Sequence, residues 1–167
     1  FPLPLTAFEK YMFLDDRPDY PMVFTLQLRL TGDIDCPAFE SSFAEALARH
    51  PLLCAWIRHT PRRGMVWNLA PEQRPVIDWA RSGIPLDNAR GGRIDLQREA
   101  GLHCWVRQGG GSAEVTLQFH HACCDGIGAF QFLADLLAAY GIRTASEGQR
   151  PNLPGCNPAD LLWRGEH

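Results

Sequence analysis

Two adjacent histidines, an aspartate and a glycine are concentrated in one heptapeptide, His120-His121-Ala122-Cys123-Cys124-Asp125-Gly126. An imidazole with an ordinary pKa takes up and returns a proton near neutral pH, so the histidine pair indicates a general base. The carboxylate four residues after the second histidine is a candidate orienting group. The alternative for such a cluster is a polar strand end whose histidines cap backbone groups or lie in solvent.

The residues before the motif alternate as in a β-strand. Over residues 113–121, Val115, Leu117 and Phe119 alternate with polar residues, which predicts that one face is buried. This parity places His121 on the apolar side and His120 on the opposite side. Burial favours neutral imidazole, the form that a general base needs. His121 is therefore the predicted base.

The two cysteines inside the motif offer a competing chemistry. His121 with Cys123 or Cys124 is a candidate nucleophilic pair or metal site. Adjacent cysteines point in divergent directions in most backbone conformations, and the sequence has no paired C-x-x-C spacing and no further ligand cluster. We therefore expect no metal site and favour the histidine base.

The elements that must position the motif can be predicted from periodicity and caps. Thr6 and Glu9 form a capping box, which opens a short helix with Phe8, Tyr11, Met12 and Leu14 on one face. Asp35 caps a second helix, which stops at His50-Pro51. The third and longest helix runs from Ile127 to Tyr140, ends at Gly141 and is expected to place its periodic apolar residues in the core: Ile127, Phe130, Leu133, Leu136, Leu137 and Tyr140.

Alternation predicts strands at residues 22–30, 52–58, 65–69, 76–79 and 102–108. The strands at 52–58 and 65–69 form a hairpin, and Gly109 to Ser112 is the turn between the last two strands. His50 and His59 lie at element ends, where we expect surface or capping histidines.

Composition restricts the class of protein. The 167 residues are 46% hydrophobic and 21% charged, as in one ordinary globular domain. The net charge of −3 gives no electrostatic case for nucleic acid or an anionic membrane, and no apolar run reaches the roughly 20 residues that cross a bilayer. The six scattered cysteines are expected to be reduced thiols in a cytoplasmic protein.

The motif resembles the HHxxxDG signature of the condensation-domain superfamily. That superfamily covers peptide-synthetase condensation domains, chloramphenicol-acetyltransferase-like enzymes and other thioester-dependent acyltransferases. Other segments resemble it in register from about residue 4 to 141: Pro4-Leu5-Thr6 with its helix, residues 28–35, the "ARHxxLR"-like residues 48–53, residues 94–96, and residues 132–136 with Tyr140.

The resemblance implies an α/β fold, in which one lobe is an α+β two-layer sandwich with a mixed, mostly antiparallel sheet covered by helices. Residues 1–145 would form the N-terminal lobe, and the Pro/Gly-rich residues 146–167 a linker or arm towards a second lobe. A lobe without its partner leaves apolar surface uncovered, so a homodimer through that face is also expected.

The resemblance also implies site roles. His121 would be the general base as an amine or hydroxyl acceptor attacks an acyl thioester, either coenzyme A or a carrier-protein phosphopantetheine, with no covalently bound cofactor. Asp125 would be mainly structural, paired with an arginine, and Gly126 would let the backbone pass close to His121. His120 would complete the motif without an assigned step.

One position departs from the family pattern. The usual arginine partner of the aspartate is replaced by Cys54. Arg58, Arg17 and Arg107 are the candidate substitutes. The alternative function is a catalytically inactive binding or interaction lobe that retains the fold.

Overall fold

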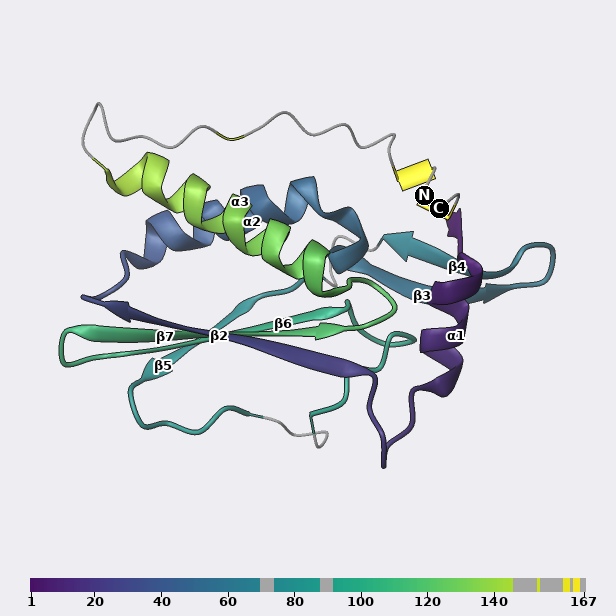
Figure 1. Cartoon of the computed structure of the whole chain (residues 1–167), viewed down its shortest axis with the longest axis horizontal. Helices are drawn as coiled ribbons and strands as arrows, with labels where there is room; N and C mark the ends of the chain where they lie inside the picture. The colour runs from purple at the N-terminus through teal and green to yellow at the C-terminus, as the bar shows by residue number, and fades with distance from the viewer. Residues whose placement is uncertain (70–73, 88–91, 146–152, 154–160, 163, 166–167) are drawn as a thin grey trace.

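Four strands form one sheet, and the two long helices lie side by side across one of its faces (Figure 1). The computed structural model describes residues 1–69, 74–87, 92–145, 153, 161–162 and 164–165. The sheet order is β2-β7-β6-β5, with β5 parallel to β6 and the other pairs antiparallel. A smaller sheet, β1-β4-β3, stands at one end beside α1 (Figure 1).

The elements in chain order are β1 (Leu3–Pro4), α1 (Ala7–Asp15), β2 (Val23–Thr31), α2 (Cys36–Arg49), the 3-10 helix η1 (Pro51–Cys54), β3 (Ala55–Thr60), β4 (Gly64–Leu69), β5 (Ile77–Arg81), β6 (Leu102–Gln108), β7 (Ser112–His120) and α3 (Gly126–Thr144). The fold class predicted from the sequence is confirmed: helices cover a mixed sheet in which antiparallel pairs predominate. No helix in the described part of the chain is long and apolar enough to span a membrane.

The helix caps are those that the sequence predicts. Thr6 and Glu9 make both bonds of the capping box at α1, and Asp35 accepts the amide of Ala38 at 2.9 Å at the start of α2. Each cap satisfies amide donors that the first helical turn leaves unpaired. Of the apolar face predicted for α1, Met12 packs against the core, whereas Phe8, Tyr11 and Leu14 are exposed.

The predicted core residues of α3 are confirmed in part: Leu136 is buried, and Leu133 and Tyr140 pack against the core, but the other three do not. Phe132, Leu136 and two alanines form its buried stripe, whereas Ile127, Phe130 and Leu137 are exposed. The helix is apolar on most of its circumference, so periodicity alone does not identify the side that packs on the sheet. The helix also continues past Gly141 to Thr144.

The segment before β3 is also corrected. Residues 51–54 form η1 instead of the start of a strand, so Cys54 precedes the hairpin strand β3. Pro51 follows the C-cap His50 and lies in the first turn of η1, where its missing amide costs nothing.

Strand β7 is buried on both faces. Val115, Leu117 and Phe119 face the helices, and Phe119 contacts Phe132 at 6.0 Å between ring centroids. On the opposite face Thr116, Gln118 and His120 are buried as well. The segment before β6 contributes to this second layer: Gln118 Nε2 donates to the carbonyl of Gly92 at 2.7 Å.

We predict that Phe132→Ala lowers the free energy of unfolding by about 3–5 kcal/mol, because it empties a fully buried site between the helices and the sheet. The control is Phe130→Ala, two residues earlier on the same helix and 62% exposed. It should change stability by no more than about 0.5 kcal/mol. Urea titrations of both variants measure the difference. Equal losses would contradict the observed helix phase.

Candidate functional site

The motif spans the end of a strand, a turn and the start of a helix. β7 ends at His120, and α3 begins at Gly126 with Asp125 as its N-cap. The backbone amide of Cys123 donates to the carbonyl of His120 at 2.9 Å, which closes the turn. His121 therefore lies just outside the strand, although its amide still donates to Met22 on the β2 side at 2.8 Å.

His121 lines a pocket of about 340 Å³. Its ring packs against Phe24 with 4.9 Å between ring centroids. Nδ1 is buried and has no hydrogen-bond partner among the described residues. For Nε2 to take up a proton from a molecule in the pocket, the neutral ring must carry its own hydrogen on the buried Nδ1.

His120 is fully buried and lies on the opposite face of β7. Its Nδ1 accepts the amide of Ala122 at 3.0 Å, so a neutral ring carries its proton on Nε2. Nε2 lies 3.8 Å from Asp16 Oδ2, and Asp16 also accepts from Arg93 at 2.7 Å and from the Met22 amide at 2.8 Å.

Burial lowers the pKa of His120 to about 4, although the nearby Asp16 carboxylate opposes this shift. The ring is neutral at pH 7 and does not line the His121 pocket. The alternation pattern thus correctly predicts that the two histidines lie on different sides of β7. It does not predict that the side of His120 is buried as well. The second face of β7 is covered too, so it is His120 that is fully enclosed, while His121 is half-buried.

Asp125 caps α3, with Oδ1 accepting the amide of Gly128 at 2.7 Å. None of the three candidate arginines forms an ion pair with it among the described residues: Arg17 pairs with Asp15, Arg107 with Asp78, and Arg58 is exposed on β3. The pKa of the Cys54 thiol is raised to about 11 by burial. At Gly126, an added Cβ would meet nothing within 4 Å, so the described residues show no close approach there.

An ion-pair network that the sequence did not predict joins α2 to α3 beside the pocket. Arg49 Nε and His50 Nε2 lie 2.7 and 2.9 Å from the same oxygen of Asp135. Burial raises the pKa of Asp135, but hydrogen bonds from Arg49 and His50 outweigh it and hold the pKa below its ordinary value. His50 is therefore more than the surface or capping residue expected from its place at a helix end. Only the helix–helix contact reveals its partner, 85 residues away.

The thiols in the motif are poor nucleophiles. Burial raises the pKa of Cys124 to about 12 and that of Cys123 well above its ordinary value, so little thiolate forms near neutral pH. Cys123 also packs so closely on Gly101 that a Cβ at position 101 would overlap its sulfur. In the described ranges no group of three or more His, Cys, Asp or Glu side chains is arranged to hold a metal ion.

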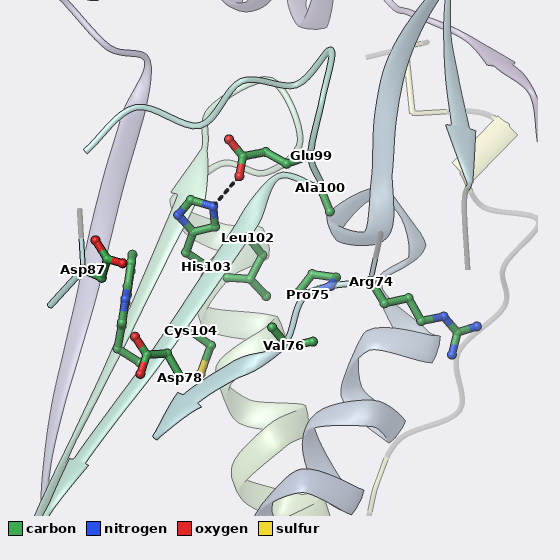
Figure 2. Close-up of a pocket in the computed structure, with 11 residues that line it drawn as sticks. Arg74, Pro75, Val76, Asp78, Asp87, Glu99, Ala100, Leu102, His103 and Cys104 are labelled. Carbon is green, nitrogen blue, oxygen red and sulfur yellow. Dashed lines mark hydrogen bonds and ion pairs between the residues drawn. The ribbon is translucent and has the colours of Figure 1, made fainter. Parts of the chain in front are cut away.

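A second pocket, of about 310 Å³, lies at the edge where β6 extends beyond β5. Figure 2 shows Glu99 bonded to His103, with Asp78 and Asp87 farther along the wall. His103 Nε2 lies 3.0 Å from Glu99, and Asp78 is already paired with Arg107. No motif residue lines this pocket, whereas His121 lines the first one.

Comparisons with known proteins agree on the kind of domain. No protein-family model matches the chain. It is 31% identical over 153 residues to CymA of Salinispora arenicola, described as a probable non-canonical nonribosomal peptide synthetase, covering 89% of this chain and 2% of that protein. It is 28% identical to the phthiocerol/phthiodiolone dimycocerosyl transferase of Mycobacterium tuberculosis, covering 85% of this chain and 34% of the transferase.

Solved structures show the same fold. The X-domain in its complex with OxyB from teicoplanin biosynthesis superposes with a TM-score of 0.73 at 25% identity, over 96% of this chain and 37% of that one. These comparisons are consistent with the condensation-domain superfamily, and the solved structures show the chloramphenicol-acetyltransferase-like fold. A variant of the starter condensation domain of rhizomide synthetase RzmA, in complex with C8-CoA, gives a TM-score of 0.80 at 14% identity, over 99% of this chain and 41% of that domain.

The condensation-like chain thus spans about a third of the mycocerosyl transferase and about two fifths of the compared solved chains. Its relatives are condensation and acyltransferase-type proteins. This supports a general acyltransferase-like kind for the domain.

We predict that His120 makes stability fall as the pH drops from about 6.5 to about 4. In that window the unfolded histidine binds a proton while the buried ring stays neutral, so each step towards acid favours the unfolded state. The loss from this residue is roughly 3 kcal/mol. Urea titrations across the window should give a shallower pH dependence for His120→Asn than for the wild type, and an NMR titration of His120 near pH 6.5 would contradict the burial effect.

Proposed function

We propose that this condensation-like domain transfers an acyl group from a thioester to an amine or hydroxyl acceptor, with His121 as the general base. The observation that carries the proposal is the placement of His121: it lines a pocket and its Nδ1 is buried. The described kinds of the relatives support it, since one is a dimycocerosyl transferase and another domain binds C8-CoA.

In the proposed step, Nε2 of His121 accepts the proton of the acceptor N–H or O–H group as that atom attacks the thioester carbonyl carbon. The tetrahedral intermediate then collapses, the C–S bond breaks, and the imidazolium returns the proton to the leaving thiolate. Coenzyme A and a carrier-protein phosphopantetheine present the same thioester, so either is a suitable donor. No covalently bound cofactor is required.

We assign Asp125 and Gly126 supporting roles. Asp125 fixes the turn by capping α3, and Gly126 opens that helix. In this proposal the N-cap bond of Asp125 replaces the family's ion pair with arginine, and His120 supports His121 by closing the turn through the Ala122 amide.

We further propose that residues 1–145 act as the N-terminal lobe of a larger catalytic unit, with residues 146–167 as the arm that leads to a second lobe. Most of 146–167 lies outside the described residues. The partial coverage of the relatives supports this division. The five described cysteines are free thiols, which supports our proposal that the protein works in the reducing cytoplasm.

A second function has two observations in its favour. The X-domain that shares this fold is known here in complex with a partner protein, OxyB, and Asp125 has no arginine partner among the described residues. A catalytically inactive interaction lobe is therefore the alternative. This alternative predicts that the domain binds a partner protein but does not transfer acyl groups.

The test is acyl transfer by His121→Ala, using the product of the complete reading frame, whether or not it extends beyond His167. We expect a loss of about 10²–10⁴-fold in kcat, the usual contribution of general base catalysis. Acyl-CoA turnover is measured by release of free thiol. The control is His59→Ala, an exposed histidine on the β3–β4 hairpin, which should retain full activity.

Cys124→Ala separates the thiol chemistry from the histidine chemistry. It should stay active, because burial raises the pKa of Cys124 to about 12. Loss of activity in Cys124→Ala with His121 intact would favour the thiol mechanism. Equal transfer by His121→Ala and the wild type would eliminate the general base and leave the interaction lobe.

The exposed apolar side chains of α1 and α3, namely Phe8, Tyr11, Leu14, Ile127 and Phe130, give a further prediction. Each is more than half exposed, and exposed apolar surface of this kind is a candidate interface. We propose that a second lobe covers it in the complete unit, and that residues 1–167 alone form a homodimer through it.

Light scattering of the isolated chain should show a dimer at high concentration. Tyr11→Arg combined with Ile127→Arg should shift it to monomer without changing its circular dichroism. A wild-type chain that stays strictly monomeric across the concentration series would contradict the dimer.

A further inference from the structure

The carboxylate of Glu9 in α1, outside the motif, accepts several hydrogen bonds. It accepts the Thr6 amide at 2.8 Å, Trp67 Nε1 at 2.9 Å and Arg164 Nε at 2.7 Å. A fourth bond, from Arg164 Nη2, measures 3.1 Å. The buried carboxylate of Glu9 thus bonds to three segments: the start of α1, strand β4 and the C-terminal turn.

Arg164 uses the rest of its guanidinium on backbone carbonyls. Nη1 donates to Leu161 at 2.8 Å and Nη2 to Pro4 at 2.7 Å. Its side chain is 15% exposed, so this ion pair is largely shielded from solvent. The planar fork of arginine reaches all three acceptors at once, which the single ammonium of a lysine does not.

These bonds fasten the C-terminal turn, residues 161–162 with 164–165, across α1. The backbone at Gly165 runs so close to Thr6 that an added Cβ would lie 2.9 Å from its Cγ2. In Figure 1 the yellow C-terminal turn lies close to the N-terminal end of α1. The turn is therefore held by charge and by shape, more than 150 residues away from its partner in sequence.

The same turn forms part of the His121 pocket. Leu161 and Arg164 line it together with Phe8, Leu52 and His121. The described side chains of that wall are largely apolar away from the charged pair, so the wall suits the apolar part of a substrate.

We propose that Arg164 is a positioning residue: its ion pair with Glu9 seats the C-terminal turn as a wall of the His121 pocket and so sets access to His121. The assignment of substrate to this pocket rests on the proposed function. The placement of the turn as a wall of the pocket does not depend on that function. Without the pair, the turn swings away and the apolar part of the substrate loses the contact with Leu161.

The first test measures access to His121 without turnover. Diethyl pyrocarbonate labelling, followed peptide by peptide by mass spectrometry, should modify His121 about tenfold faster or more in Arg164→Gln than in the wild type, since several charge-assisted hydrogen bonds are lost. The matched control is Arg143→Gln, which breaks the Arg143–Glu45 ion pair between α3 and α2. It should leave the labelling rate unchanged.

A second variant reaches the same state by another route. Gly165→Ala forces the turn away from Thr6 while keeping both charges, and it should speed His121 labelling as well. Arg164→Lys should fall between Arg164→Gln and the wild type. Thermal unfolding of each variant shows that the fold persists under the labelling conditions.

Kinetics on the complete protein supply the functional readout. Arg164→Gln should raise KM for octanoyl-CoA more than for acetyl-CoA while kcat stays near the wild-type value, because His121 is untouched. Equal labelling of His121 in Arg164→Gln, Gly165→Ala and Arg143→Gln would overturn the proposal that the C-terminal turn limits access to His121. Full activity of His121→Ala would instead remove the general base and leave the labelling result standing.

Discussion

Both faces of strand β7 are buried, and this constraint determines where the two histidines of the motif lie. The helices α2 and α3 cover one face, and the segment before β6 covers the other. A histidine inside the strand is then neutral, as His120 is. Its Nδ1 accepts the Ala122 amide, whereas its buried Nε2 has no hydrogen-bond partner among the described residues. The next residue leaves the strand and meets the pocket. The end of the strand, between residues 120 and 121, therefore separates the enclosed histidine from the one that lines the pocket.

Two partly buried groups of paired charges lie beside that pocket. Arg49 and His50 fasten α2 to α3 through Asp135, and Arg164 fastens the C-terminal turn to α1 through Glu9. In each case the charge is satisfied by donors from distant segments, which offsets the cost of burial. The site is thus built by long-range contacts around a locally encoded turn.

The locally encoded features were predictable from the sequence. The capping box at Thr6, the cap at Asp35, the β6–β7 hairpin and the turn before α3 all depend on residues a few positions apart. The side of α3 that packs on the sheet was not predictable, because apolar residues surround the helix and only tertiary packing selects Phe132 over Phe130. The partners of His50 and Glu9 were missed for the same reason: they lie 85 and 155 residues away.

Gly101 and Cys123 occupy one space, because a Cβ on the glycine would overlap the cysteine sulfur. The size of residue 101 and the size of residue 123 are thereby coupled. A larger residue just before the strand that starts at Leu102 is accommodated only if the residue in the motif turn becomes smaller. Among relatives, a side chain at the first position requires a smaller one at the second, and paired substitution at these positions would be a sequence record of this packing.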